Sequence, residues 1–285
     1  MIRIAILAAL PQEYRPFQKL FGTWRLLFWQ PFRVFYHRTA RCELFLVETG
    51  MGNQQAEKAA RHALAMAPFD LIVSTGFAGS LCRDLPVGQV VCARDLAVWT
   101  TSASIPLEGR FQISTPARLA AFCEAQDILS ARVLTLERPQ PKTVLTRHIG
   151  TIPTVVDMES VLVAEMAYRQ GIAFLCLRAV SDALTDEIAW DLDAVVDSTG
   201  RVRIPKVLIT LLRKPALLAS FYRLWRNSRE AGQHLAQALT AMLRFPDRDL
   251  QALIRELQLL PASPIGPRQP GNKGNLSGGV EPTTR

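Results

Sequence analysis

Short apolar runs alternate with amphipathic segments along the first 200 residues of the chain. The runs at Ile2–Ala8, 71–74 and 173–180 contain few polar side chains, which is typical of strands buried on both faces of a sheet. Between these runs, apolar residues recur at helical spacing. This spacing predicts helices over residues 11–20, 54–66, 116–125 and 160–169.

Residues 32–37 and 42–48 alternate between apolar and polar positions, which predicts the two strands of a hairpin. We expect a turn at Gly50–Gly52, with Asn53 capping the next helix, and a glycine-bearing loop at 75–79. Further strands are predicted at 89–93, 96–99, 132–136 and 154–156. Strands that alternate with helices in this way predict an α/β fold, a single domain with a central mixed sheet and helices on both sides.

Composition narrows the class of protein. The 285 residues are 49% hydrophobic and 20% charged, which excludes a disordered, collagen-like or coiled-coil chain. The chain has no apolar run of the roughly 18 residues that a membrane span needs. Its five cysteines are scattered without a CxxC pair, which argues against a disulfide framework or a zinc site and favours a reducing, cytoplasmic location. The apolar N-terminus carries one basic residue, Arg3, so a buried strand explains it better than a cleavable signal.

Three segments of the chain differ in sequence pattern and composition, and we expect each to have its own role. Residues 1–200 carry the α/β pattern, 201–260 are helical and basic, and 261–285 have the composition of a disordered tail. Of the formal net charge of +8, the stretch 201–232 supplies +7, with eight basic residues against Glu230 (8 − 1 = 7). A basic segment on a nearly neutral body indicates a local surface role.

The basic segment 206–229 has an apolar stripe at helical spacing, formed by Leu217, Leu218, Phe221, Leu224 and Trp225. Two interpretations stay open: a helix packed on the core with a solvated basic face, or an interfacial helix that contacts anionic lipid headgroups. Nucleic-acid binding is a weaker third, because no recognised nucleic-acid motif accompanies the charges.

Three carboxylates follow predicted strands. Glu13 follows the first strand, Glu159 the strand at 154–156, and Asp182 the strand at 173–180. Each alone could be an acid placed at a helix start by the helix dipole. Ligands in α/β sheets gather outside the carboxyl ends of the strands, so the three together predict a site.

Five segments occur in one order and carry a resemblance. They are Ile6-Leu-Ala-Ala-Leu-Pro-Gln-Glu13, Thr49-Gly-Met-Gly52, Ser74-Thr-Gly-Phe-Ala-Gly79, Val156-Asp-Met-Glu159 and Arg178-Ala-Val-Ser-Asp182. Over residues 1–200 the chain resembles the purine/uridine phosphorylase superfamily. The most similar branches are the methylthioadenosine/S-adenosylhomocysteine nucleosidases and the hopanoid-associated phosphorylase. The Asp-Met-Glu-Ser form and the basic, Leu-rich extension look more like the latter.

The resemblance implies cleavage of the N-glycosidic bond of a 5′-substituted adenosine. By this resemblance, Asp182 protonates the leaving adenine at N7 with help from Ser181, and Glu13 activates water. Glu159 holds the ribose hydroxyls and Met158 packs on the sugar. The remaining substrate contacts fall on Gly50, Met51, Gly52, Gly76, Phe77, Ala78 and Gly79.

The hopanoid-associated branch implies adenosylhopane as the substrate, which is lipid-linked. The other nucleosidase branch, a phosphate-dependent phosphorylase and a non-catalytic nucleoside-binding protein remain alternatives. The superfamily implies a homodimer or larger assembly and needs no cofactor, and no pair of histidines here has metal-ligand spacing. Family nucleosidases often have Ser where this chain has Phe77 and Glu where it has Asp157. Residues 135–146, which should contact the base, are divergent, so no stacking residue is assigned.

Overall fold

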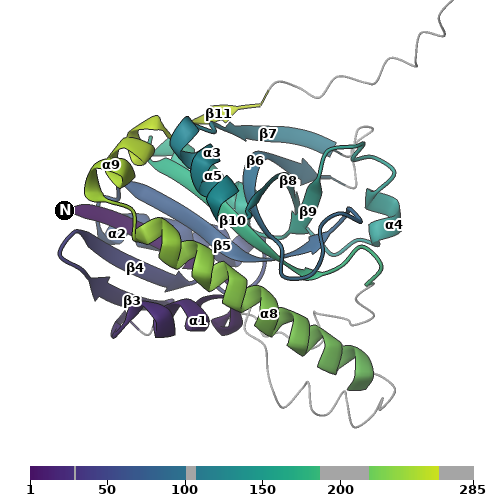
Figure 1. Cartoon of the computed structure of the whole chain (residues 1–285), viewed down its shortest axis with the longest axis horizontal. Coiled ribbons are helices and arrows are strands. Elements are labelled where there is room, and N and C mark those ends of the chain that lie inside the picture. Colours follow the sequence, from purple (N-terminus) through teal and green to yellow (C-terminus); the bar gives the residue numbers. More distant parts are fainter. Residues whose placement is uncertain (29, 101–106, 187–217, 263–285) are drawn as a thin grey trace, which may run out of the picture.

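A computed structural model describes residues 1–28, 30–100, 107–186 and 218–262 of the chain. The elements follow one another in the order β1 (Ile2–Ala8), α1 (Pro11–Phe21), β2 (Arg25–Phe28), β3 (Arg33–Arg38), β4 (Cys42–Glu48), α2 (Asn53–Met66), β5 (Leu71–Ser80), β6 (Val90–Trp99), β7 (Leu107–Ile113), α3 (Ala117–Ala125), β8 (Leu129–Leu136), α4 (Lys142–Leu145), β9 (Thr154–Asp157), α5 (Ser160–Arg169), β10 (Ala173–Asp182), α8 (Leu218–Leu243), α9 (Asp247–Glu256) and β11 (Leu259–Pro261). Figure 1 shows them around one sheet. The α/β fold with a mixed sheet and flanking helices is confirmed.

The centre of the sheet closes on itself. Strand β10 lies between β5, with which it is parallel, and β6, with which it is antiparallel. Strand β6 continues to β8, β8 to β9, and β9 returns to β5, so five strands form a closed ring. On the other side of β5, strands β1, β4, β3 and β2 extend the sheet as an open wing.

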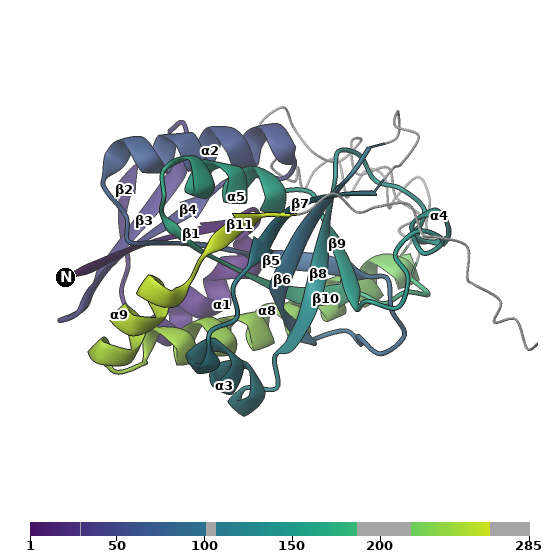
Figure 2. The same ribbon diagram turned by 90° about the horizontal axis from the view of Figure 1, so that it is seen from above.

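Helices cover both faces of this sheet. Figure 2 shows α2 and α5 on one face and α1, α8, α3 and α9 on the other. The buried strand runs of the sequence explain this arrangement, because β1, the first half of β5 and β10 are apolar on both faces and need cover on each. Their side chains form one continuous core with the inner faces of the helices.

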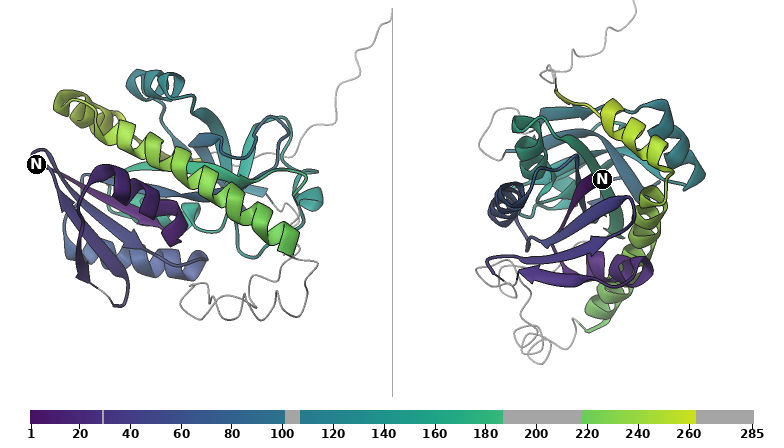
Figure 3. Two further views of the ribbon diagram at one scale, coloured as in Figure 1. Left: turned by 60° about the horizontal axis from the view of Figure 1, so that its bottom comes forward. Right: turned by 90° about the vertical axis from the view of Figure 1, so that its left-hand side faces the viewer.

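The C-terminal helix α8 lies on the body of the fold. It crosses one face beside α1 (Figure 3), and its buried residues Ala231, Leu235 and Leu239 contact the core over β5, β6 and β10. The approach to α1 is close at Gly232, where a Cβ atom would lie 2.6 Å from the backbone oxygen of Gln12. After α9, strand β11 pairs with β7 at the sheet edge. No helix among the described residues has the length and apolar character to cross a bilayer.

Several local expectations were wrong, each for a physical reason. Residues 75–79 are not a loop: β5 runs on to Ser80, because β10 pairs with it along this whole stretch. The strands expected at 89–93 and 96–99 are one strand with a register shift, so Arg94 marks a bulge. Asn53 begins α2, and Gly52 stands at the N-cap. Strands β2, β7 and β11 were not expected from the sequence pattern.

Candidate active site

Glu13 lies in the first turn of α1, just after the end of β1. Its side chain is buried, at 4% exposure, and folds back over the end of β1. One carboxylate oxygen, Oε2, accepts the backbone N–H groups of Ala9 (2.7 Å) and Leu10 (2.9 Å), and Oε1 accepts the N–H of Phe77 (3.0 Å). Burial raises the pKa of Glu13 above its ordinary value, and these N–H donors limit the rise. The carboxylate is therefore held in one orientation and is more basic than an exposed one.

Two glycines in β5 leave room for acidic side chains. A Cβ atom at Gly76 would lie 2.9 Å from Glu13 Oε1, and one at Gly79 would lie 2.6 Å from Asp182 Oδ2. Both are closer than any real Cβ contact, so each acid occupies the space that a side chain on β5 would fill. The glycines within this strand thus bring carboxyl groups from α1 and from β10 against one backbone.

A buried ion pair lies beneath these acids. Arg178 on β10 and Asp157 at the end of β9 are both buried, and Nε and an Nη atom of Arg178 each lie 2.8 Å from Asp157 Oδ2. Arg178 also donates to Ser74 Oγ (2.9 Å) and Ser160 Oγ (2.8 Å). Asp157 Oδ1 accepts the Thr135 hydroxyl at 2.8 Å. Five elements, β5, β8, β9, β10 and α5, are therefore joined by charge-assisted hydrogen bonds, which are stronger than neutral ones.

Glu159 follows Asp157 and stands at the start of α5. Its Oε1 accepts the backbone N–H of Gly52 at 2.9 Å, which links the turn before α2 to the end of β9. Burial, and next the charge of Asp157, raise the pKa of Glu159 to about 7. The Gly52 N–H and the charge of Arg178 act in the opposite direction. This carboxyl group therefore changes charge near neutral pH.

Asp182 ends β10 and is buried at 6% exposure. Its Oδ1 accepts the Ser181 hydroxyl at 2.8 Å. Its Oδ2 faces Lys142 Nζ at 2.5 Å, a contact that the sequence did not predict. Lys142 is itself buried and lies in the divergent segment 135–146.

The structure places Glu13, Ser181 and Asp182 around the second half of β5. Gly76 and Phe77 contact Glu13, the Ala78 carbonyl oxygen lies 3.5 Å from Ser181 Oγ, and Gly79 contacts Asp182. Gly50 and Gly52 have positive φ angles of 77° and 95° in the turn that leads to Glu159, with Met51 between them and Met158 next to the acid. Among the described residues, no cluster of His, Cys, Asp and Glu has the arrangement of a metal site.

Sequence reasoning missed Lys142 and gave no role to Arg178. A signal existed for Arg178, which is a cation in the middle of an apolar run and is tolerated in a strand only with a buried partner. Lys142 stands in the divergent segment 135–146, whose sequence offers no comparable signal.

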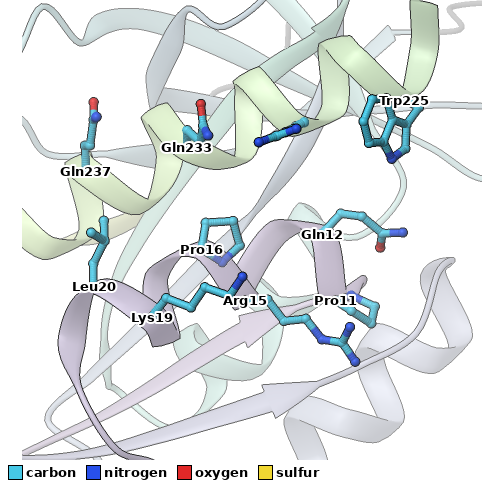
Figure 4. Close-up of a pocket in the computed structure, with 10 residues that line it drawn as sticks. Pro11, Gln12, Arg15, Pro16, Lys19, Leu20, Trp225, Gln233 and Gln237 are labelled. Carbon is cyan, nitrogen blue, oxygen red and sulfur yellow. The ribbon is translucent and has the colours of Figure 1, made fainter. Parts of the chain in front are cut away.

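A separate groove of about 670 Å³ lies between α1 and α8. Figure 4 shows Trp225 of α8 directed toward Gln12 and Pro11 of α1, with Gln233 and Gln237 further along α8. Arg15, Lys19 and Arg229 contribute its charged groups, and none of the three carboxylates lines it. The groove is therefore cationic and distinct from the acidic site.

Comparison with known proteins identifies the family of this chain. Residues 3–212 match the family model described as the phosphorylase superfamily. Futalosine hydrolase of Streptomyces coelicolor is 31% identical over an alignment of 161 residues, and the match covers 49% of this chain and 68% of that protein. A 5′-methylthioadenosine/S-adenosylhomocysteine nucleosidase of Haemophilus influenzae is 25% identical over 158 residues, with the same two coverages of 49% and 68%.

Solved structures share the fold. Futalosine hydrolase of Helicobacter pylori superposes with a TM-score of 0.63 at 16% identity, covering 85% of this chain and 97% of that one. The 5′-methylthioadenosine/S-adenosylhomocysteine nucleosidase of the same organism, bound to butyl-thio-DADMe-Immucillin-A, gives 0.63 at 15% identity, with coverages of 85% and 98%. The family model spans most of the chain and includes all three site carboxylates, and the chain belongs to the phosphorylase superfamily.

Proposed function

We propose that this protein hydrolyses the N-glycosidic bond of a 5′-substituted adenosine and releases adenine. Its superfamily and its nucleosidase relatives make it an N-glycosidase. The observation that carries the finer proposal is the placement of Glu13 and Asp182 against the same strand, with Glu159 held at the neighbouring strand end. This bond cleavage needs an acid for the leaving base and a base for the attacking water, and Asp182 and Glu13 both approach β5.

The reaction has three requirements, and one carboxyl group suits each. The leaving purine must gain a proton, and we assign its transfer to Asp182. The ribosyl cation that develops must be stabilised, which suits Glu159 at the ribose hydroxyls. The attacking water must lose a proton, which suits Glu13, because its carboxylate is fixed by three backbone donors.

For the 5′ substituent we propose a large apolar group, with adenosylhopane as the specific candidate. The support comes from the resemblance, since related nucleosidases often have a polar residue where this chain has Phe77, whose ring is partly buried and packs against the core. Under this proposal the protein acts in hopanoid biosynthesis, on a lipid-linked nucleoside at the cytoplasmic face of a membrane.

The test is adenine release from a panel of 5′-substituted adenosines in phosphate-free buffer, with the sugar product identified by mass. We expect the free 1-hydroxy sugar and the highest kcat/KM with the apolar 5′ group. Preference for methylthioadenosine or S-adenosylhomocysteine would identify the other nucleosidase activity. A strict need for phosphate would indicate a phosphorylase, and binding without turnover of any nucleoside would indicate a non-catalytic binding protein.

The pKa of Glu159 predicts a pH dependence of nucleoside binding. Ribose hydroxyls donate to an ionised carboxylate, and Glu159 is protonated in the free site below about pH 7. Affinity for a non-hydrolysable nucleoside analogue is therefore expected to be weak in acid and to rise as the pH increases through about 7. Calorimetric titration of wild type and Glu159→Gln checks this, and the rise should be absent in the variant. A rise that persists unchanged in Glu159→Gln would assign it to another group.

We also propose that the basic segment 206–229 contacts anionic lipid. Residues 206–217 lie outside the described residues, but the first turns of α8 support the proposal. Tyr222 and Trp225 are 63% and 48% exposed, and the guanidinium of Arg229 lies 5.8 Å from the Trp225 ring centre. Exposed aromatic and Arg side chains on one helix are typical of membrane interfaces.

Co-sedimentation with vesicles that contain anionic phospholipid tests this contact. We expect binding at low salt that weakens as salt is added, and a further loss in the triple variant Arg223→Gln, Arg226→Gln, Arg229→Gln. The matched control removes the same number of positive charges at the far end of the helical region, in the triple variant Arg244→Gln, Arg248→Gln, Arg255→Gln. Equal loss in both triple variants would mean a non-specific charge effect, and no binding at low salt would leave α8 as a packed helix with a solvated face.

The superfamily further suggests a homodimer, which we retain as part of the proposal. Strand β2 at the edge of the sheet exposes Leu26 (42%) and Phe28 (46%), so it offers apolar surface to a second copy. Sedimentation equilibrium of the wild type and of Phe28→Ser would test it.

A further inference from the structure

Lys142 makes three contacts, all of them at the end of β10. Its Nζ lies 2.5 Å from Asp182 Oδ2, 3.2 Å from the Asp182 carbonyl oxygen and 2.6 Å from the Ala183 carbonyl oxygen. Its side chain is buried, at 6% exposure. An ammonium group has three protons, and three acceptors meet it here. A buried lysine in this setting keeps its charge only through the partner that it has, so Lys142 and Asp182 form a unit.

The same geometry shows that Asp182 cannot supply the catalytic proton alone. Oδ1 accepts a hydrogen bond from Ser181, and Oδ2 accepts one from Lys142. As the partner of the Lys142 ammonium group, Asp182 is an ionised carboxylate, which has no proton to give. The dissociable proton nearest to the proposed acid position is therefore on Lys142 Nζ, directly beside Oδ2.

We propose that Lys142 and Asp182 act as one acid, in which Lys142 holds the proton in the resting enzyme and Asp182 passes it to the leaving base. This rests on the proposed function, and it assigns to a residue of the divergent segment 135–146 the supply of the catalytic proton. The position of the pair supports it: Gly79 confines Oδ2, so the oxygen that faces Lys142 is also the one that lies against β5 in the site.

The step balances in protons and electrons. As the C1′–N9 bond breaks, its electron pair goes to the purine, whose N7 becomes basic. Asp182 Oδ2 gives a proton to N7 and receives one from Lys142 Nζ, which leaves a neutral amine. Water adds to C1′ and loses its proton to Glu13. Solvent then returns a proton to Lys142 and removes one from Glu13, so the net reaction is nucleoside plus water to adenine plus the 1-hydroxy sugar.

The charges around the pair are few. Asp186 lies just beyond it, where its Oδ2 accepts the Ala183 N–H at 3.1 Å, and it is paired in turn with Arg223 of α8 at 3.6 Å. Glu137 and Arg138, which precede α4, are exposed. Asp157, Glu159 and Arg178 lie at the end of β9 and on β10, where Asp157 and Arg178 pair with each other. Among the described residues, the ion-pair partner of Lys142 is Asp182.

Two variants and two substrates test the proposal. Lys142→Met removes the charge and the proton, whereas Lys142→Arg keeps the charge but holds its proton too tightly to donate it. With the best 5′-substituted adenosine, we expect both variants to lower kcat by about 10²-fold or more, as Asp182→Asn should. With the corresponding 4-nitrophenyl riboside, whose leaving group needs no proton, all three should stay within about threefold of the wild type.

Controls separate this from a structural role. The ratio of the two rates in one preparation does not depend on the folded fraction, so partial unfolding lowers both rates and leaves the ratio unchanged. Arg132→Met removes a partner from the Arg132–Asp95 ion pair elsewhere in the sheet and should also leave the ratio unchanged. Acidic buffer should restore part of the Lys142→Met activity, because solvent then protonates Asp182 directly.

Two results would overturn the proposal. Wild-type rates in Lys142→Arg would mean that charge alone suffices, and an equal loss on both substrates in Lys142→Met would mean that Lys142 only holds the structure. Failure of the wild type to cleave any purine nucleoside is a different result, because it would refute the proposed function itself.

Discussion

Replacing Glu13 by Gln is expected to remove most adenine release, lowering kcat by about 10²–10⁴. The amide has nearly the shape of the carboxylate, and its one oxygen can still accept the N–H groups of Ala9 and Leu10, whereas its NH2 group cannot accept the N–H of Phe77. The amide cannot take a proton from water, so the site loses its base while two of the three backbone hydrogen bonds can remain. Steady-state assays in phosphate-free buffer measure the effect, and thermal unfolding of the same preparation checks that the fold is intact.

An exposed glutamate provides the control for this variant. Glu57→Gln makes the same chemical change on α2, where Glu57 pairs with Arg61, and should leave kcat unchanged. The buried Glu13 carboxylate would also repel a phosphate ion in a confined site of low dielectric. A Glu13→Gln variant that gains phosphate-dependent turnover, with ribose 1-phosphate as product, would therefore show that Glu13 only excludes phosphate.

Replacing Arg178 by Met is expected to lower the free energy of unfolding by about 3–5 kcal/mol. The reason is less the lost contacts than the charge left behind, since Asp157 would remain buried without its cation. Chemical denaturation with two spectroscopic probes gives the value. The exposed pair of Arg61 and Glu57 provides the comparison, and Arg61→Met should change stability by less than about 1 kcal/mol.

A double variant distinguishes this explanation from loss of the other hydrogen bonds of Arg178. If the isolated charge is the cause, adding Asp157→Asn to Arg178→Met should recover part of the lost stability, so that the two changes are not additive. Additive losses would mean that Arg178 stabilises the protein through its other hydrogen bonds, to Ser74 and Ser160. The site should fail in either case, because β9 and β10 would no longer be held together beside it.

The sequence predicted the strands that are buried and the acids that follow them, because both leave a local pattern. Strand β1 was predicted with its observed bounds, and the hairpin of β3 and β4 within one or two residues. The second half of β5 was mistaken for a loop because glycine usually marks a turn. Here the two glycines make space for Glu13 and Asp182, whose positions depend on tertiary structure that no short window contains.

The same limit applies to the site. The three carboxylates were found from their place after strands and from the superfamily resemblance, and their roles stay a prediction. Lys142 was not found, because forty residues separate it from Asp182 and its own segment has no recognisable motif. Arg178 belongs to the motif that ends in Asp182, yet its partner Asp157 becomes evident only when β9 and β10 are placed in the ring.

The position of β10 also affects how the chain can be made. It is the last strand of the ring in sequence but lies between β5 and β6, which are completed by residue 99. A growing chain on the ribosome therefore carries two long apolar strands with open hydrogen-bonding edges until about residue 182 has emerged. This interval is the period in which the nascent protein is most exposed to misassociation, and in which a chaperone would have most to protect.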